Sequence, residues 1–208
     1  MLADSDADGS DIARSLSQLP YLADADWAVR ERALSTLYEL EPTLLAQHAD
    51  AVVARLEDSH GEVRTWALLI LGRLEPEALA QHTNAIVARL EDSYWRVRRA
   101  ALDTLGKLEP ATLAQHIDAV IARLEDSNWP VRTADLETLG KVEPTTLAQH
   151  TDAVLARLED SNWQVREAAL KTLGKLEPTL LAQHAGAVVA RLEDSYWHVR
   201  RAALETLG

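Results

Sequence analysis

Apolar residues recur along the chain at steps of three and four, the spacing that places side chains on one face of an α-helix. One predicted helix, from about Tyr94 to Leu108, has an inward stripe made of Val97, Ala101, Leu105 and Leu108. The next, from about Pro110 to Glu125, has a stripe made of Leu113, Ile117, Val120, Ile121 and Leu124. Proline suits the first turn of a helix and disfavours helical geometry in the residue before it, here Glu109. The pattern predicts pairs of helices separated by short breaks.

The same pair of helices returns along the chain. The stretch from Leu90 to Arg123 reappears with few changes from Leu56, Leu124 and Leu158, and in truncated form from Leu192. A step of 34 residues separates its marker residues, which are Asp58, Asp92, Asp126, Asp160 and Asp194. A strict period of this length is typical of a stacked repeat array, in which each repeat contacts only its neighbours. We therefore expect an all-α solenoid with five full repeats, at 41–74, 75–108, 109–142, 143–176 and 177–208.

The N-terminal region departs from the repeat. Residues 1–10 are acidic and small, which predicts a disordered tail. Residues 11–40 have weaker helical spacing, interrupted by Pro20, and are interpreted as a degenerate N-terminal capping repeat. Asp4, Asp6, Asp8 and Gly9 copy the opening of a calcium loop, but Ser15 stands where the closing acidic ligand is required, so an acidic tail is the better interpretation.

Residues at the ends of the second helix carry local signals. Asp92 or Ser93 is predicted to cap that helix, and Glu62 to complete a capping box with Ser59. Glycine recurs near its end, at Gly72, Gly106, Gly140 and Gly174. Because the first repeat has Tyr38 at this position, and tyrosine resists positive φ, we predict a right-handed glycine that lets a neighbouring helix approach.

Composition excludes several classes of function. The chain has 33 acidic and 21 basic residues, a net charge of −12, which disfavours nucleic acid as a partner. Without cysteine it has no disulfide framework and no thiolate metal site. The start lacks the features of a secretory signal, and no apolar run reaches the roughly 18 residues of a membrane span. We expect a soluble cytoplasmic protein that uses no cofactor.

The turns carry a second motif, an Asp followed six residues later by the Arg of a Val-Arg pair. It occurs as Asp24 with Val29-Arg30, and again at Asp58, Arg64, Asp92, Arg98, Asp126, Arg132, Asp160, Arg166, Asp194 and Arg200. Over residues 24–208 this motif resembles HEAT repeats. The resemblance implies a right-handed α-solenoid of about six two-helix repeats, in which these Asp and Arg residues form a ladder of pairs between successive repeats. An Arg fork can meet a carboxylate and turn carbonyls together. The tetratricopeptide repeat shares the period, but its aromatic pattern is absent here.

Aromatic and histidine residues also recur. Tryptophan stands at one position of the second helix, as Trp27, Trp95, Trp129, Trp163 and Trp197. We interpret these rings as packing across the joint between repeats and against an Arg such as Arg98, rather than as a ligand site. Histidine follows Gln in each repeat, as His48, His82, His116, His150 and His184. Repeats about 10 Å apart place these His too far from one another to share a metal ion, so we expect them to hydrogen-bond or cap the backbone.

Asp135 is exceptional. It occupies a position that is alanine in the other repeats, on the inward stripe next to Val131. A lone carboxylate there is costly unless it is paired, and Arg132 or Arg166 are the expected partners. We interpret it as tolerated drift in one repeat, while a local functional site is the alternative.

Variation between repeats is concentrated on one stripe of the second helix. Its residues are Arg96, Arg99, Asp103, Thr133, Glu137, Gln164, Glu167, Lys171, His198 and Arg201. Second helices line the concave side of HEAT-like arrays, so the resemblance implies that this stripe is a candidate partner-binding face. A merely solvated face would explain the same variation.

The most favoured function is a non-enzymatic repeat scaffold that binds a protein or peptide. The high identity between repeats fits a designed or consensus-like array, a recently duplicated natural gene, or a fragment of a longer array. Two other classes of function remain as alternatives. The first is an enzyme: some HEAT-like proteins are phycobilin lyases, although no acid or Tyr is singled out here, and others are DNA glycosylases, which need a basic groove. The second is end-to-end self-association through Ala203, Leu204 and Leu207.

Overall fold

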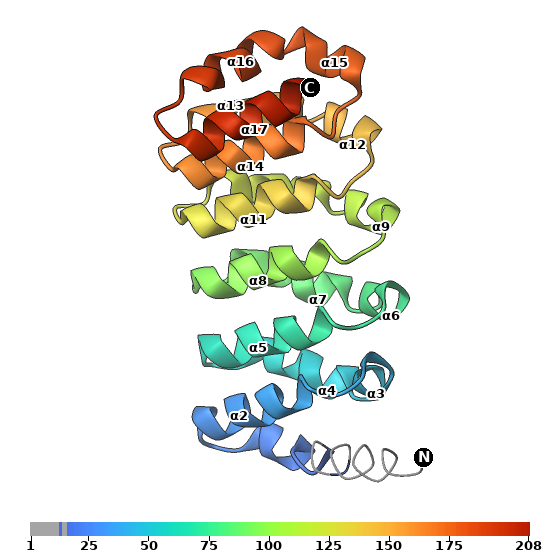
Figure 1. Cartoon of the computed structure of the whole chain (residues 1–208). Helices are drawn as coiled ribbons and strands as arrows, with labels where there is room; N and C mark the ends of the chain where they lie inside the picture. The colour runs from blue at the N-terminus through green and yellow to red at the C-terminus, as the bar shows by residue number, and fades with distance from the viewer. Residues whose placement is uncertain (1–12, 14–15) are drawn as a thin grey trace, which may run out of the picture. The chain divides into compact units, whose positions relative to one another are not determined.

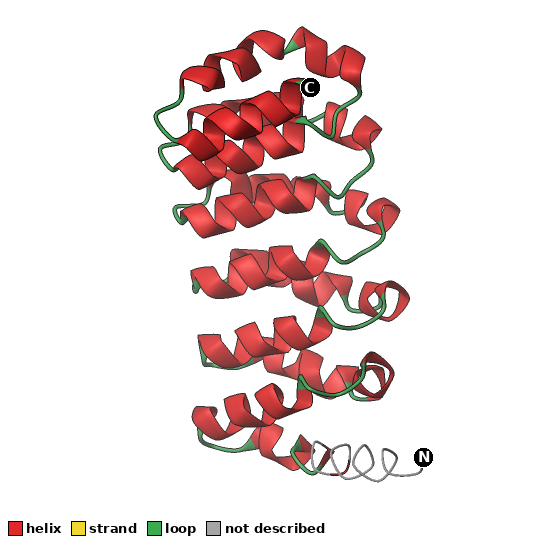
Figure 2. Cartoon of the chain, viewed as in Figure 1, coloured by secondary structure: helices red, strands yellow, loops and turns green. Residues whose placement is uncertain are grey.

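The computed structural model describes residue 13 and residues 16–208, and the tail and calcium-loop predictions for residues 1–10 and Ser15 lie outside this part of the chain. The described residues form helices joined by turns and contain no strand (Figure 2). The predicted all-α repeat fold is therefore confirmed. The chain divides into two compact units, residues 1–107 (the N-terminal unit) and residues 108–208 (the C-terminal unit).

The elements follow one order in every repeat (Figure 1). In the N-terminal unit they are η1 (Leu19–Ala23), α2 (Trp27–Leu37), α3 (Pro42–Gln47), α4 (Ala49–Val53), η2 (Ala54–Glu57), α5 (Gly61–Leu71), α6 (Pro76–Ala80), α7 (Thr83–Val87), η3 (Ala88–Glu91) and α8 (Trp95–Leu105). In the C-terminal unit they are α9 (Pro110–Ala114), α10 (Ile117–Ile121), η4 (Ala122–Glu125), α11 (Trp129–Leu139), α12 (Pro144–Ala148), α13 (Thr151–Ala156), η5 (Arg157–Glu159), α14 (Trp163–Leu173), α15 (Pro178–Gln183), α16 (Ala185–Ala190), η6 (Arg191–Glu193) and α17 (Trp197–Leu207).

The second helix of each repeat is a single α-helix, and within each unit successive second helices pack side by side (Figure 1). In α5 the apolar stripe of Val63, Ala67, Leu68 and Leu71 is at most 1% exposed. Burial of such a stripe against the neighbouring helix is the main stabilisation of helices this short, which are marginal in isolation. The apolar spacing in the sequence therefore identifies the packed face correctly.

The prediction of one continuous first helix is wrong. The stretch from Pro110 to Glu125 forms three pieces, α9, α10 and η4, separated at Gln115 and His116. The backbone N–H of His116 donates to the Leu113 carbonyl (2.9 Å), a short-range bond that ends α9. Leu113, Val120 and Leu124 are nevertheless at most 2% exposed. Apolar periodicity reports which face is buried, and this face is preserved across an interruption of the backbone hydrogen bonds.

Histidine occupies this break in the five full repeats. His116 ends α9 and precedes α10, and its carbonyl accepts from the N–H groups of Ala119 (3.1 Å) and Val120 (3.2 Å). None of the five imidazoles accepts a hydrogen bond from the first turn of the following helix. The prediction of side-chain capping by these His is therefore wrong, and their contribution at the break comes from the backbone.

The predicted caps of the second helix are wrong in two places. Asp92 Oδ1 accepts from the N–H of Tyr94 (2.9 Å), the residue just before α8, and does not reach its first turn. The predicted capping box is absent, because Glu62 instead accepts from the Tyr94 hydroxyl (2.7 Å). Each carboxylate makes a contact with another group that a purely local sequence pattern does not report.

The glycine prediction is confirmed, since the described residues include no glycine with positive φ. A Cβ on Gly72 would lie 3.3 Å from the Thr104 hydroxyl, which donates to the Leu68 carbonyl (3.0 Å). Thr172 donates in the same way to Leu136 (2.8 Å) in the C-terminal unit. A small residue at this position lets the hydroxyl of the next helix reach a carbonyl of the preceding one.

Asp135 is completely buried in α11, and neither of its carboxylate oxygens has a hydrogen-bond partner. The expected pairing with Arg132 or Arg166 is wrong, because these side chains bind Asp160 and Asp194. Burial raises the pKa of Asp135 well above its usual value of 3.8, with Arg123 opposing this shift and Asp126 adding to it. Asp135 is thus an isolated acid in a position that is built for alanine.

We expect Asp135→Ala to raise the free energy of unfolding by about 1–3 kcal/mol at pH 7, because it removes a buried unsatisfied polar group. The folded-state pKa is raised, so this carboxyl is least costly below about pH 4, and its cost grows as pH rises from there toward the folded-state pKa. Thermal unfolding at several pH values should show a stability gap between the variant and the parent that widens with pH. Asp152→Ala, at an exposed acid, is the control, and a loss of stability in Asp135→Ala alone would contradict this account.

Candidate functional site

The second helices are held in place by a buried arginine in each turn. In the N-terminal unit, Arg64 donates through Nε to Asp92 Oδ2 (2.7 Å) and through Nη2 to Asp92 Oδ1 (2.6 Å). Its Nη1 donates to the carbonyl of Asp58 in its own turn (2.7 Å). One planar fork thus joins the turn of its own repeat to the carboxylate of the next, a bidentate geometry that lysine cannot reproduce.

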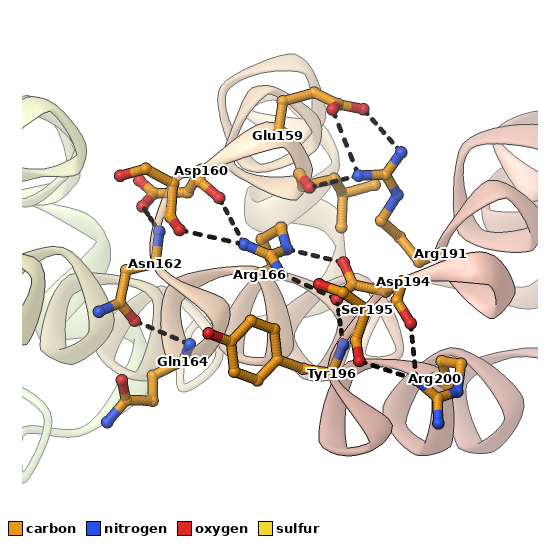
Figure 3. A network of polar contacts seen from close by, with 12 residues as sticks. Glu159, Asp160, Asn162, Gln164, Arg166, Arg191, Asp194, Ser195, Tyr196 and Arg200 are labelled. Carbon is orange, nitrogen blue, oxygen red and sulfur yellow. Dashed lines mark hydrogen bonds and ion pairs between the residues drawn. The ribbon is translucent and has the colours of Figure 1, made fainter.

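The same contact recurs in both units. The other bidentate pairs are Arg30 with Asp58, Arg132 with Asp160, and Arg166 with Asp194. Figure 3 shows Arg166 between Asp160 and Asp194. Arg98 and Arg200 donate to the carbonyls of Asp92 and Asp194 in their own turns (2.8 and 2.7 Å), and Asp126 accepts from the N–H of Asn128 (2.9 Å).

Three carboxylates of this ladder, those of Asp58, Asp160 and Asp194, are held in the charged form. Burial raises the pKa of Asp194, but hydrogen bonds from Arg166 and from the N–H of Tyr196 outweigh it, so that the pKa of Asp194 lies below its usual value. Asp160 and Asp58 have lowered pKa values for the same reasons, with Arg132 and Arg30 as donors. The side chains of Arg166 and Asp194 are only 10% and 5% exposed, so each charge depends on the other.

Sequence reasoning missed a second ladder. Arg89 Nη1 donates to the carbonyl of Leu56 in the preceding repeat (2.8 Å), and its Nη2 pairs with Glu57 (2.9 Å). Arg55, Arg157 and Arg191 donate to a leucine carbonyl 33 residues earlier in the same way. The sequence signal for this ladder is Ala-Arg-Leu-Glu, which recurs in the five full repeats. The Arg of this motif donates to a backbone carbonyl, and any residue can supply a carbonyl, so the sequence does not identify the partner.

Two of the recurring tryptophans stack on a ring of the next repeat, and none of the five is a core residue. Trp27 stacks on His60 (ring centroids 3.8 Å apart), and Trp163 stacks on His198 (4.7 Å). Trp27, Trp129 and Trp197 are nevertheless between 39% and 54% exposed. The guanidinium of Arg96 lies over the Trp95 ring, 5.5 Å from its centroid. The packing interpretation is therefore confirmed for Trp27 and Trp163, and for the other three tryptophans it stays a prediction.

The variable stripe lies along the second helices, and most of its charges are paired. Arg99 pairs with Asp103 (3.6 Å), Lys171 with Glu167 (2.8 Å), and Arg201 with Glu205 (3.4 Å). Arg96 reaches the preceding repeat at Glu62 (3.0 Å). In the C-terminal unit Glu137 is exposed, whereas Thr133, Gln164 and His198 are half-buried in or near the joints. The stripe is therefore a real surface of each unit, formed by neutralised pairs with few isolated charges.

A surface cavity of about 240 Å³ lies between α11 and α14, and its lining includes Glu137, Lys141, Lys171 and Lys175. The described residues contain no cluster of three or more His, Asp or Glu side chains that could hold a metal ion. Within that same part of the chain, no helix combines the length and the apolar character needed to cross a membrane.

Comparison with known families gives two matches. The family model described as HEAT repeats matches residues 83–153 and 151–208, and that of the HEAT repeat associated with sister chromatid cohesion matches residues 32–71. No curated protein matches the sequence.

Several solved structures share the fold. An engineered protein is 14% identical, with a TM-score of 0.73 over 93% of this chain and 95% of its own. A designed armadillo repeat protein in complex with the peptide (KR)4 is 15% identical, with a TM-score of 0.71 over 92% and 98%. The complex of CpcE and CpcF of phycocyanin lyase from Nostoc sp. PCC7120 contains a chain that is 23% identical, with a TM-score of 0.65 over 92% and 75%. At these identities the likeness concerns the fold alone.

We expect Arg166→Gln to lower the free energy of unfolding by about 3 kcal/mol at pH 7, because it leaves the buried Asp194 carboxylate unpaired. The control is Arg201→Gln, which removes an exposed ion pair and should cost about 0.5 kcal/mol or less. Because the pKa of Asp194 is lowered in the folded chain, the pair stabilises above about pH 4, and this stabilisation is lost as pH falls through the folded-state pKa. Urea unfolding at pH 7 and pH 3 should show the deficit shrinking in acid. Equal losses of unfolding free energy in the two variants would contradict the larger contribution proposed for the buried pair.

Proposed function

The chain belongs to the HEAT-repeat family, and on that premise we propose that it is a non-enzymatic scaffold whose second helices bind a protein or peptide. Each unit has its own candidate surface, made of α2, α5 and α8 in the N-terminal unit and of α11, α14 and α17 in the C-terminal unit. The role is one of recognition, in which side chains on a fixed frame contact the partner.

The observation that carries this proposal is the separation of constant from variable residues. The Asp and Arg of the ladder are the same in every repeat and are turned into the joints. The residues that differ, such as Arg99, Thr133 and Glu167, share one position on the second helix. Because the arginine forks are made by other side chains, the residue at that position can change without loss of the forks, as a recognition surface requires.

The comparisons support the same proposal indirectly. One of the proteins with this fold is a designed armadillo repeat protein in complex with a peptide. The likeness to a phycocyanin lyase chain favours an enzyme instead, but a lyase needs an acid or Tyr free to act on its substrate. Tyr94, the tyrosine at the start of α8, donates its hydroxyl proton to Glu62, which raises the pKa of Tyr94. A lack of any absorbance change on mixing with bilin would support the scaffold.

A second candidate function, self-association, is favoured by one face of α17. Leu204 is 62% exposed, whereas Leu136 and Leu170, the equivalent residues of α11 and α14, are completely buried by the following helix. Trp197 and Leu207 are 54% and 40% exposed. Among the residues that the structure describes, Arg200 donates through Nη1 alone, to the carbonyls of Asp194 and Ser195. This face has the composition of the joints that are covered elsewhere in the unit, so a second copy of the chain is the proposed occupant.

We expect peptides selected from a displayed random library to protect second-helix side chains from hydroxyl-radical labelling. Protection should fall on the stripe that includes Arg99 and Gln164, because variable side chains on a fixed frame supply the specificity. Exposed side chains of the first segments, such as Glu143 and Glu177, serve as internal controls and should label equally in the free and bound chain. Protection confined to the first segments, or the recovery of no binding peptide, would overturn the proposal.

For self-association, sedimentation velocity of the 208-residue chain should show species that grow with concentration. Leu204→Asp should return the chain to a single monomeric species, because it places a charge in the apolar contact. Asp152→Ala, at an exposed acid outside that face, should leave the distribution unchanged. A parent chain that stays monomeric at the highest concentration would exclude this second function.

A further inference from the structure

We propose that the main anchor of the peptide-binding surface is a cluster at the α2–α5 joint, and that its ligand is a peptide segment with an apolar side chain next to an acidic one. The cluster, called here the Trp66 patch, consists of Tyr38, Trp66, Leu69 and Arg73. This inference rests on the proposed function and specifies where on the second helices, and with what chemistry, a partner is recognised.

The patch is first recognised as a departure from the repeat. Tyr38 stands where later repeats have Gly72, Gly106, Gly140 and Gly174. Trp66 stands where they have Ala100, Ala134, Ala168 and Ala202. Leu69 stands where they have Asp103, Glu137, Lys171 and Glu205. Three replacements of small or charged residues by large apolar ones thus occur within 32 residues, in a chain that is otherwise closely periodic.

The structure brings these departures together in space. The rings of Tyr38 and Trp66 meet edge to face, with centroids 5.9 Å apart. The guanidinium of Arg73 lies over the Tyr38 ring, 4.8 Å from its centroid. The indole N–H of Trp66 donates to Glu31 (3.0 Å), which fixes the orientation of the ring. Residues from two successive second helices therefore form one ordered surface, with its aromatic rings already oriented.

Packing of the fold does not account for the whole patch. Trp66 and Tyr38 are half-buried, and their mutual contact has a structural use in the joint. Leu69, in contrast, is 40% exposed at a position that is acidic or basic in the following repeats. An apolar side chain that replaces a charged one on the variable stripe costs solubility and contributes no buried contact of similar size. Leu69 lies three residues after Trp66 in α5, so the two side chains share one face of the helix. Trp, Tyr and Arg, the other residue types of the patch, are those enriched in binding hot spots.

The charges around the patch determine what its ligand carries. Arg73 forms no ion pair among the described residues, and its guanidinium is held over Tyr38. Glu31, on the other side, is hydrogen-bonded to Trp66. The Arg73 guanidinium is therefore available to a ligand, and it lies beside the Tyr38 ring of the patch. A Leu, Met or Phe packed on Trp66 and Leu69 would place an adjacent Asp or Glu within reach of Arg73, which favours carboxylates through its planar fork.

The test uses variants that restore the residue of the other repeats, so that the fold is preserved by a change the array already tolerates. Random dodecapeptides displayed on phage are selected on the parent chain, and the affinity of the recovered peptides is measured by fluorescence anisotropy. We expect an apolar–acidic pair to be enriched among them. Trp66→Ala and Leu69→Asp should each weaken binding about tenfold or more, as loss of an interface anchor does.

The matched control is Val189→Asp, which places the same charge at an exposed aliphatic side chain of α16, outside the proposed binding surfaces, and should leave affinity unchanged. Circular dichroism and melting distinguish lost binding from lost folding, and Leu69→Asp remains decisive if Trp66→Ala loosens the joint. Arg73→Glu should weaken binding severalfold, and exchange of the peptide's acid for lysine should restore it.

The outcomes separate this inference from the function on which it rests. Recovery of peptides that bind parent, Trp66→Ala and Leu69→Asp equally, or that lack an acidic residue, would overturn the Trp66 patch while leaving the scaffold role intact. Failure to recover any peptide would overturn both. Concentration-dependent association of the parent that Leu69→Asp abolishes would show that the patch binds a second copy of the chain, and would also overturn the proposed ligand.

Discussion

A single contact, the buried arginine fork, determines how successive repeats meet within each unit. Arg64 and its equivalents bind a carboxylate with two nitrogens and a turn carbonyl with the third. The partners are almost fully buried, so neither charge can be exposed to water without opening the joint. A buried ion pair adds little net stability over an apolar contact of the same shape, but loss of one partner costs several kcal/mol. The fork therefore fixes the register between repeats more than it adds to their stability.

The other polar contacts of the joints reinforce that register from different directions. The second arginine ladder binds leucine carbonyls, and threonine hydroxyls such as Thr104 and Thr172 bind helix carbonyls of the preceding repeat. Each contact spans a fixed number of residues, so all of them fit only one alignment of the two helices. Asp135 shows the opposite case, since a carboxyl in the same buried layer without such partners has its pKa raised and is left unsatisfied.

Much of the architecture could be predicted from the sequence, because the period of 34 residues and the apolar spacing report stacking and burial directly. Leu113 and Val120 were predicted to be buried, and both are. The break at His116, the carbonyl acceptors of Arg89 and the contacts of Glu62 could not be predicted in this way, because they depend on backbone geometry or on a partner 32 or 33 residues away. The candidate binding face was inferred from variation alone, which does not distinguish the paired Lys171 from the exposed Leu69.

The position of each fork at one place in every repeat has an evolutionary consequence. Deletion of residues 31–64 by recombination would bring Arg30 into the place of Arg64 and give it Asp92 as its new acceptor. The cut would keep the arginine forks paired, although Arg89 and Arg96 would lose the carboxylates of Glu57 and Glu62. We therefore expect chains that gain or lose whole repeats to keep the register of their joints. The Trp66 patch is the exception, since it draws on two adjacent repeats and this deletion would remove Tyr38 and Glu31 while Trp66 remains. The number of repeats can therefore change without loss of the forks, whereas the Trp66 patch is kept only when both of its repeats are kept.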